Sequence, residues 1–455
     1  MSKCVQADVK VTNTNLTKVQ KEAIGLLSVG TFLEYFDLML YVHMAVLLND
    51  LFFSKTDPHS AALMSAIAFC STFVFRPIGA LIIGRIGDNI GRKITVVITT
   101  FMMAITCITM ANLPTYAQIG VAATWGVTIC RIVQGMSSME EVIGAELYLT
   151  ESIDLPQRYP IVASITIFSA LGGTAALGIA SLSTMYGLNW RYAFWVGATI
   201  ALIGTVARTA LRETPEFADA KRQLKQDLAL VSEKGYINTQ KVKDNIWNKK
   251  VNPKTVVAYF LIQCTRPICF YFTYIYCGTI LKNLFDYTSE QIIHHSFLLS
   301  LVDLLGITLV AYLSSKIYPL NILKIRLVAS AGFVLLMPYL LQNITMPIHL
   351  FLIQSFFIVF AVDSGPAAPI FYKHFPVFKR FTYASFTYAL SRAIMYIITS
   401  FGLVYLTEQY SSWGILVIMI PAIVGFAFAL LHFLKLERTA GHYPQKSFLS
   451  VGKIV

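Results

Sequence analysis

Twelve apolar stretches, each long enough to cross a lipid bilayer, recur along this chain of 455 residues. A helix needs about 20 apolar residues to span the hydrocarbon core, where only helices and closed barrels satisfy their own backbone polar groups. We therefore predict an all-α polytopic membrane protein with twelve transmembrane helices. Their approximate limits are 23–48, 60–84, 94–113, 117–143, 161–186, 190–211, 255–281, 292–314, 323–341, 347–370, 382–406 and 413–434.

The distribution of charge supports this class of protein and orients it. Only 13% of the residues are charged, against roughly 25% in soluble domains. The predicted loops on one side carry most of the lysines and arginines, and such loops stay in the cytoplasm. The net charge of +12 is explained by basic loops that face the anionic lipids of the cytoplasmic leaflet, so it does not imply a nucleic-acid partner. The first 22 residues are polar and lack the apolar core of a cleavable signal, so we expect both termini to be cytoplasmic.

These limits divide the chain into two halves joined by a polar connector. We expect a cytoplasmic tail, a first six-helix bundle, a cytoplasmic central loop, a second six-helix bundle and a cytoplasmic carboxyl tail, at 1–22, 23–211, 212–254, 255–434 and 435–455 respectively. The carboxyl tail has no heptad pattern, so it does not predict a coiled coil.

A short charged turn with three glycines separates the second and third apolar stretches. The spacing Gly84-x-x-x-Asp88-x-x-Gly91-Arg92-Lys93 resembles the loop between the second and third helices of the major facilitator superfamily. The preceding Arg76-Pro77-Ile78-Gly79 narrows the resemblance to its metabolite:proton symporter branch, which contains proline/betaine, α-ketoglutarate and citrate carriers. The resemblance implies a bacterial inner-membrane protein and a gating motif near the amino end of the eleventh helix, composed of Arg76, Gly84, Asp88, Gly91, Arg92 and Lys93.

Further motifs extend the resemblance over roughly residues 25–434. Leu211-Arg-Glu-Thr-Pro-Glu-Phe217 matches the segment that follows the sixth helix in that branch, and Trp190-Arg-x-x-Phe194 matches a motif at the outer surface. Two halves with a substrate site near the midplane between them are the architecture that the resemblance implies. The second half is less similar, because its equivalent charged turn at 314–324 lacks the Asp-Arg-x-Gly-Arg motif.

Two predicted helices in the first half carry ionisable residues at helical spacing. Glu34, Asp37 and Tyr41 share one face of the first helix. Each buried carboxylate costs about 2.5–3.5 kcal/mol at the bilayer centre. The fourth helix places Arg131, Gln134 and Glu141 on one stripe, although Met139 and Glu140 replace the glycine pair of the family motif. Either one carboxylate only ties two helices together through an arginine, or the cluster binds and releases a proton beside the substrate.

The second half adds charged and aromatic residues within predicted helices. The Tyr rings of its first helix either pack against neighbouring helices or bind a quaternary ammonium group by cation–π attraction. The candidate residues for proton coupling and the substrate cavity, from both halves, are Glu34, Asp37, Tyr41, Arg131, Gln134, Glu141, Arg266, Tyr274, Tyr276, Asp363 and Arg392.

The function that we predict is proton-coupled symport of a small zwitterion, such as proline or glycine betaine, by alternating access. A dicarboxylate or α-keto acid is the alternative substrate, because Arg131, Arg266 and Arg392 are each able to bind a carboxylate. An Arg266 without an acidic partner in the central cavity would favour an anionic substrate over a net-neutral one. A membrane sensor that no longer transports is the alternative of another class.

We predict no enzymatic activity, since the sequence contains no His-rich metal set. It also contains no phosphate-binding loop, in keeping with transport that does not require a nucleotide. The expected coupling ion is the proton, without a cofactor or metal. The expected partners are a small-molecule solute and the lipid bilayer, with the protein a monomer.

Overall fold

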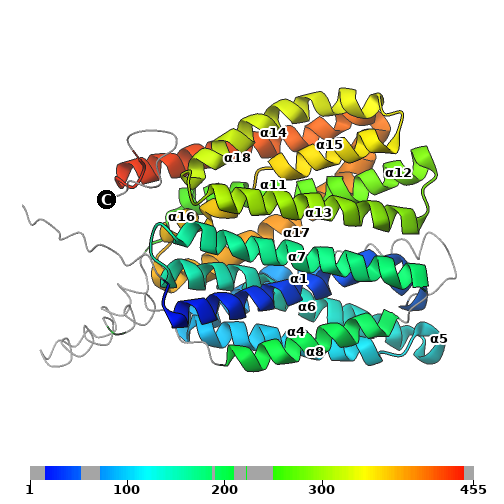
Figure 1. The fold of residues 1–455 in the computed structure, drawn as a ribbon, viewed down its shortest axis with the longest axis horizontal. Coiled ribbons are helices and arrows are strands. Elements are labelled where there is room, and N and C mark those ends of the chain that lie inside the picture. The colour runs from blue at the N-terminus through cyan, green and yellow to red at the C-terminus, as the bar shows by residue number, and fades with distance from the viewer. Residues whose placement is uncertain (1–15, 53–71, 187–189, 210–221, 223–249, 445–455) are drawn as a thin grey trace, which may run out of the picture.

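The computed structural model describes residues 16–52, 72–186, 190–209, 222 and 250–444 (Figure 1). Most of the predicted central loop lies outside these residues, as do residues 60–71 of the second predicted helix. The side chains of Asp37, Tyr41, Arg92 and Glu141 also lie outside the described part, although their backbones belong to described helices.

The first half of the chain forms long helices that run side by side (Figure 1). Helix α1 packs against α7, and α4 packs against both α6 and α8. The helices of this half are α1 (Lys18–Phe52), α3 (Arg76–Asn89), α4 (Arg92–Asn112), α5 (Tyr116–Ile119), α6 (Val121–Ser152), α7 (Arg158–Tyr186) and α8 (Trp190–Arg208).

The second half repeats the arrangement with more interruptions. Its elements are α11 (Pro253–Phe270), the π-helix η1 (Tyr271–Tyr276), α12 (Cys277–Phe285), α13 (Ser289–Leu313), α14 (Pro319–Gln342), α15 (Pro347–Phe360), the 3₁₀ turn η2 (Gly365–Ala367), α16 (Ala368–Lys373), α17 (Val377–Tyr410), the 3₁₀ turn η3 (Ser411–Trp413) and α18 (Gly414–Thr439).

The outer surface of the bundle is apolar, as a lipid-facing surface must be. Trp125, Val206, Leu305 and Val328 are each more than 60% exposed, whereas large apolar side chains on a soluble protein are mostly buried. Eight helical stretches within the described residues are long and apolar enough to cross a membrane, and the last of them, Val377–Thr439, contains both α17 and α18. The all-helical membrane class is therefore confirmed, while the count of twelve spans stays a prediction.

Several helix limits differ from the predicted ones for local reasons. The predicted fourth helix ends at 143, but α6 continues to Ser152, because Glu146 and Glu151 find buried partners on the second half. The predicted tenth helix is continuous, but α15 ends at Phe360 and the helix resumes only at η2. Pro366 and Pro369 in this restart lack the backbone donor that a continuous helix requires.

The predicted seventh helix is continuous but changes its pitch in the middle. Pro267 removes a backbone donor, and the π-helix η1 follows four residues later. The side-chain amide of Gln354 donates to the carbonyl of Thr273 within η1 at 2.6 Å, and His295 lies 2.8 Å from the other end of Gln354. Helices α13 and α15 therefore hold the π segment in place.

The two halves share one hydrophobic core at the end of the bundle where α1 begins and α18 ends, which we call the terminal end (Figure 1). Leu27 and Val142 of the first half belong to the same buried cluster as Phe371 and Phe433 of the second. Two other buried clusters belong mainly to one half each. The halves are thus joined most tightly at the terminal end.

Candidate functional site: a charged cavity between the halves

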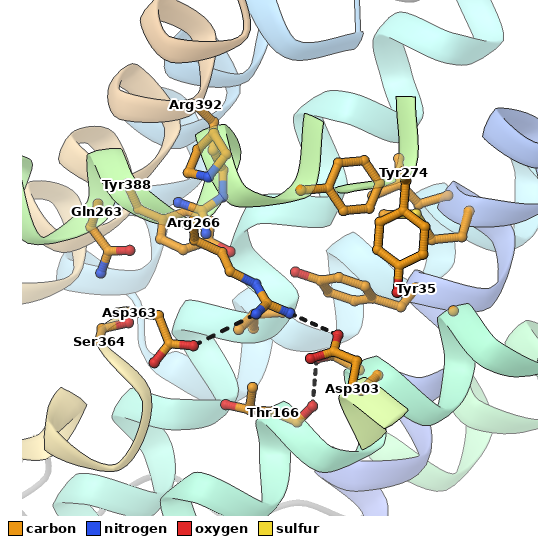
Figure 2. Close-up of a pocket in the computed structure, with 18 of the residues that line it drawn as sticks. Tyr35, Thr166, Gln263, Arg266, Tyr274, Asp303, Asp363, Ser364, Tyr388 and Arg392 are labelled. Atoms are coloured by element: carbon orange, nitrogen blue, oxygen red, sulfur yellow. Dashed lines mark hydrogen bonds and ion pairs between the residues drawn. The ribbon is translucent and has the colours of Figure 1, made fainter. Parts of the chain in front are cut away.

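A cavity of about 140 Å³ lies between the two halves of the bundle (Figure 2). A single water needs roughly 10–15 Å³, so there is room for a small organic solute. Helices α1, α3, α6 and α7 line it from the first half, and α11, η1, α13 and α17 from the second. The segment between α15 and η2 completes the wall with Asp363 and Ser364.

Arg266 on α11 is held by two carboxylates at the centre of this cavity. One guanidinium nitrogen lies 3.1 Å from Asp303 of α13 and another 3.8 Å from Asp363 (Figure 2). Asp363 also accepts a hydrogen bond of 2.9 Å from Arg326 of α14. This cluster connects four segments of the second half, and the break after α15 allows Asp363 to join it.

Arg392 enters the cavity from the middle of α17 and is bound differently. Its guanidinium carbon lies 3.2 Å from the centre of the Tyr388 ring, and the residue is only 8% exposed. Within the described part of the chain it forms no ion pair with a carboxylate, and its Nη1 has no hydrogen-bond partner. A buried guanidinium of this kind is available to an anionic group of a ligand.

Aromatic rings form much of the remaining wall. The rings of Phe270 and Tyr274 lie 5.2 Å apart, and those of Phe73 and Tyr396 lie 4.2 Å apart. Tyr35 of α1 faces the cavity near Tyr274 (Figure 2). Such surfaces bind organic cations through their π faces.

Glu146 of α6 is a lining carboxylate that the sequence did not reveal. The hydroxyl of Tyr372 on α16 donates a short hydrogen bond to it. Because the predicted fourth helix ends at 143, Glu146 falls within an expected loop. An acidic residue in a loop is common and does not indicate a functional site. Asp303 is visible in the sequence as a charge within a predicted helix, but only the fold places it against Arg266.

The predicted site residues separate into two groups. Arg266, Tyr274, Asp363 and Arg392 line the cavity, together with Arg76 from the predicted gating motif. Glu34, Arg131 and Gln134 are buried outside the lining, where Arg131 donates to Gln134 at 3.0 Å. Tyr276 also lies outside it and stacks on Phe272 at 5.7 Å. The side chains of Asp37, Tyr41 and Glu141 lie outside the described part.

The charged turn places Asp88 against the second half. Its carboxylate accepts hydrogen bonds from the amides of Phe381 and Thr382 on α17, at 3.2 and 2.8 Å. Gly84 makes this approach possible, since an added Cβ would lie 2.9 Å from the Cα of Thr382. Gly91 precedes α4 with φ 144°, a conformation that favours glycine. The Arg92 side chain lies outside the described part, and Lys93 is half-buried at the beginning of α4.

Lipid-length helices around a charged, solute-sized cavity define a polytopic membrane protein with an internal binding site. Residues 27–399 match the Major Facilitator Superfamily, and the chain belongs to that family. The fold agrees: the proton:xylose symporter XylE, solved with 6-bromo-6-deoxy-D-glucose, superposes with a TM-score of 0.73 over 92% of this chain and 95% of that one, at 14% identity.

Relatives found by sequence are transport proteins by name, not enzymes. The chain is 35% identical over 208 residues to the inner membrane metabolite transport protein YhjE of Escherichia coli (strain K12). It is 30% identical over 213 residues to the proline/betaine transporter of Salmonella typhimurium. These two alignments cover 43% and 45% of this chain and about half of the relatives' length, 47% and 43%.

Proposed function

We propose that this protein is a proton-coupled symporter of a small zwitterionic solute, such as proline or glycine betaine, in the bacterial inner membrane. Both termini are then cytoplasmic, and the terminal end of the bundle is the cytoplasmic end. The solute occupies the cavity between the halves, which opens to the two sides of the membrane in turn. The names of the relatives and the family are in keeping with this proposal.

The observation that carries the proposal is the charge balance of the cavity wall. Among the described residues, three arginines and three carboxylic acids line it: Arg76, Arg266, Arg392, Glu146, Asp303 and Asp363. A net-neutral solute leaves this balance unchanged. A dicarboxylate would add two negative charges, and Arg266, the natural partner for one of them, already contacts Asp303 and Asp363.

Contacts at the terminal end supply the closed gate that alternating access requires. Among the described residues, three carboxylates of the first half accept hydrogen bonds from the second half there: Asp88 from Phe381 and Thr382, Glu151 from Arg380, and Glu146 from Tyr372. Opening this end separates all three carboxylates from their partners. Glu146 belongs to both the gate and the cavity wall, so a solute in the cavity is in a position to influence the gate.

Proton coupling requires a carboxylate that is exposed to the cavity in one state. Asp303 lines the cavity and has one oxygen, Oδ1, without a hydrogen-bond partner in the described part. A proton gradient of one pH unit supplies about 1.36 kcal/mol, and 100 mV adds about 2.3 kcal/mol per charge. The buried residues Glu34 and Arg131 form the second candidate for the proton site. Substitution of Asp303 or of Glu34 distinguishes the two candidates.

The test is uptake into proteoliposomes with an inward proton gradient, using labelled proline, glycine betaine, α-ketoglutarate and citrate. We expect accumulation of a zwitterion that a protonophore abolishes. Accumulation of a dicarboxylate instead would contradict the zwitterion assignment. No accumulation of any solute by folded protein would contradict the transport function and favour a sensor.

A further inference from the structure

Three residues of the cavity wall, Arg392, Gln263 and Asp303, each bury a polar atom that has no hydrogen-bond partner within the described residues. Two are donors, Nη1 of Arg392 and Nε2 of Gln263, and one is an acceptor, Oδ1 of Asp303. The residues are only 8%, 2% and 7% exposed. Leaving a buried polar atom without a hydrogen-bond partner is energetically costly. Because these atoms surround a solute-sized cavity, their positions indicate that a bound ligand supplies the missing hydrogen-bond partners.

The two donors come from helices that pack together. Arg392 lies in the middle of α17 and Gln263 in α11, and these helices are in direct contact. The Tyr388 ring lies against the guanidinium of Arg392 and restricts its orientation. A planar guanidinium with a neighbouring amide donor suits the two oxygens of a carboxylate.

The acceptor lies on the other side of the cavity. Figure 2 shows Gln263 and Arg392 on one side of Arg266, and Asp303 and Tyr274 on the other. Asp303 already neutralises part of Arg266, but its second oxygen is available. The neighbouring rings of Phe270 and Tyr274 provide π faces beside it. A carboxylate with adjacent aromatic rings suits a substituted ammonium group.

We propose that the cavity binds an α-amino or α-ammonio monocarboxylate in one orientation, with its carboxylate on Arg392 and Gln263 and its cationic group towards Asp303 and the Phe270–Tyr274 pair. This assignment rests on the proposed function and specifies the substrate class: a solute must carry both charges. Arg392, rather than Arg266, is the residue that selects for the carboxylate.

Ligand binding to the full-length protein in lipid nanodiscs tests the carboxylate requirement without any substitution. The probes are glycine betaine and choline, which share a trimethylammonium group but differ in that choline has a hydroxyl in place of the carboxylate. We expect glycine betaine to bind at least about tenfold more tightly than choline. Equal binding of the two would overturn the assignment.

Substitution then tests the residues. Arg392→Gln removes the charge, and we expect it to weaken betaine binding at least tenfold while choline binding stays the same. Gln263→Met keeps the size but removes the amide donor, and a smaller loss of betaine binding is expected. Ser391→Ala is the matched control, because Ser391 neighbours Arg392 on α17 and does not line the cavity. Within the described part of the chain its hydroxyl donates to the Tyr388 carbonyl alone. Thermal unfolding of each variant shows whether it has folded.

The outcomes separate this inference from the proposed function. Betaine transport and binding that survive in folded Arg392→Gln would overturn the role of Arg392 and leave zwitterion symport intact. If the native protein binds α-ketoglutarate instead of betaine, and Arg392→Gln abolishes that binding, the role of Arg392 as a carboxylate site stands, but the requirement for both charges and the zwitterion function are overturned. Binding of choline alone would overturn both.

Discussion

Thr382 on α17 donates both its backbone amide and its hydroxyl to the carboxylate of Asp88 on α3, at 2.8 and 2.6 Å, across 294 residues of sequence. A carboxylate from the charged turn of the first half thus accepts from two backbone amides near the beginning of a helix in the second half. Hydrogen bonds to a charged acceptor contribute about 1.5–3 kcal/mol each. This contact is the most direct chemical connection between the turn and the opposite half.

Asp88→Asn should open the terminal end, because the amide is a weaker acceptor than the carboxylate. We expect the equilibrium between closed and open forms to shift at least about tenfold. The measurement is the alkylation rate of a cysteine introduced by Ser385→Cys, which lies buried just beyond this contact on α17. Asp154→Asn, an exposed acid beyond α6, is the control. An unchanged alkylation rate would show that Asp88 does not hold the gate.

Gly84→Ala should destabilise the same contact by steric means. Its Cβ would lie 2.9 Å from backbone of α17, so the helices must separate. Overpacking of this kind costs about 1–3 kcal/mol. Gly25→Ala is the matched control, because nothing lies within 4 Å of its Cβ and alanine favours a helix. The melting temperature in detergent should fall for Gly84→Ala and not for Gly25→Ala. Equal melting temperatures would mean that separating α3 from α17 does not reduce the stability of the protein.

Asp363→Asn should destabilise the second half more than other charge removals in the cavity. Asp363 contacts both Arg266 and Arg326, and removing one partner of a buried ion pair costs about 3–5 kcal/mol. Adding Arg326→Met removes one of the two arginines that Asp363→Asn leaves without their carboxylate. The double variant should therefore recover part of the lost unfolding free energy. Chemical unfolding measures both effects. A double variant whose loss equals the sum of the single losses would argue against the pairing.

Asp303→Asn should uncouple transport from the proton. A permanently neutral side chain neither gains nor releases a proton, so we expect gradient-driven accumulation to fall to the equilibrium level. Solute exchange should continue only at higher solute concentrations, because Asp303 also faces the cationic group of the solute. Proteoliposomes with and without a pH gradient provide the measurement. Glu34→Gln is the comparison: loss of accumulation in that variant, with normal coupling in Asp303→Asn, would move the proton site to the first helix.

Tyr274→Leu should weaken binding of a cationic group by about 0.5–2 kcal/mol, roughly two- to thirtyfold in affinity, whereas Tyr274→Phe keeps the π face and should bind normally. Tyr276→Leu is the control, because Tyr276 lies outside the cavity lining although it occupies the same π segment. Equilibrium binding of glycine betaine distinguishes them. An equal loss in both leucine variants would indicate a packing effect on the segment rather than a contact with solute.

The sequence determined the membrane class and the family because both depend on local patterns. The length of an apolar stretch indicates whether it can span a membrane. The run from Arg76 to Lys93 is a contiguous motif, so it can be recognised in the sequence without a structure. Four of the predicted cavity residues line the cavity, namely Arg266, Tyr274, Asp363 and Arg392. The three charged ones could be predicted because an ionisable residue inside a spanning helix is costly without a role.

The partners of these residues were decided only by the tertiary structure. Helical spacing places Glu34 and Arg131 on faces of their own helices, but packing buries both away from the cavity. Conversely, Glu146 lies beyond the predicted end of its helix, and Asp303 meets Arg266 across 37 residues. Which arginine is neutralised and which is left for a ligand depends on how helices rotate and break. Within the described residues, Arg266 is paired because the interruption after α15 allows Asp363 to reach α11, whereas no carboxylate lies within ion-pair distance of Arg392.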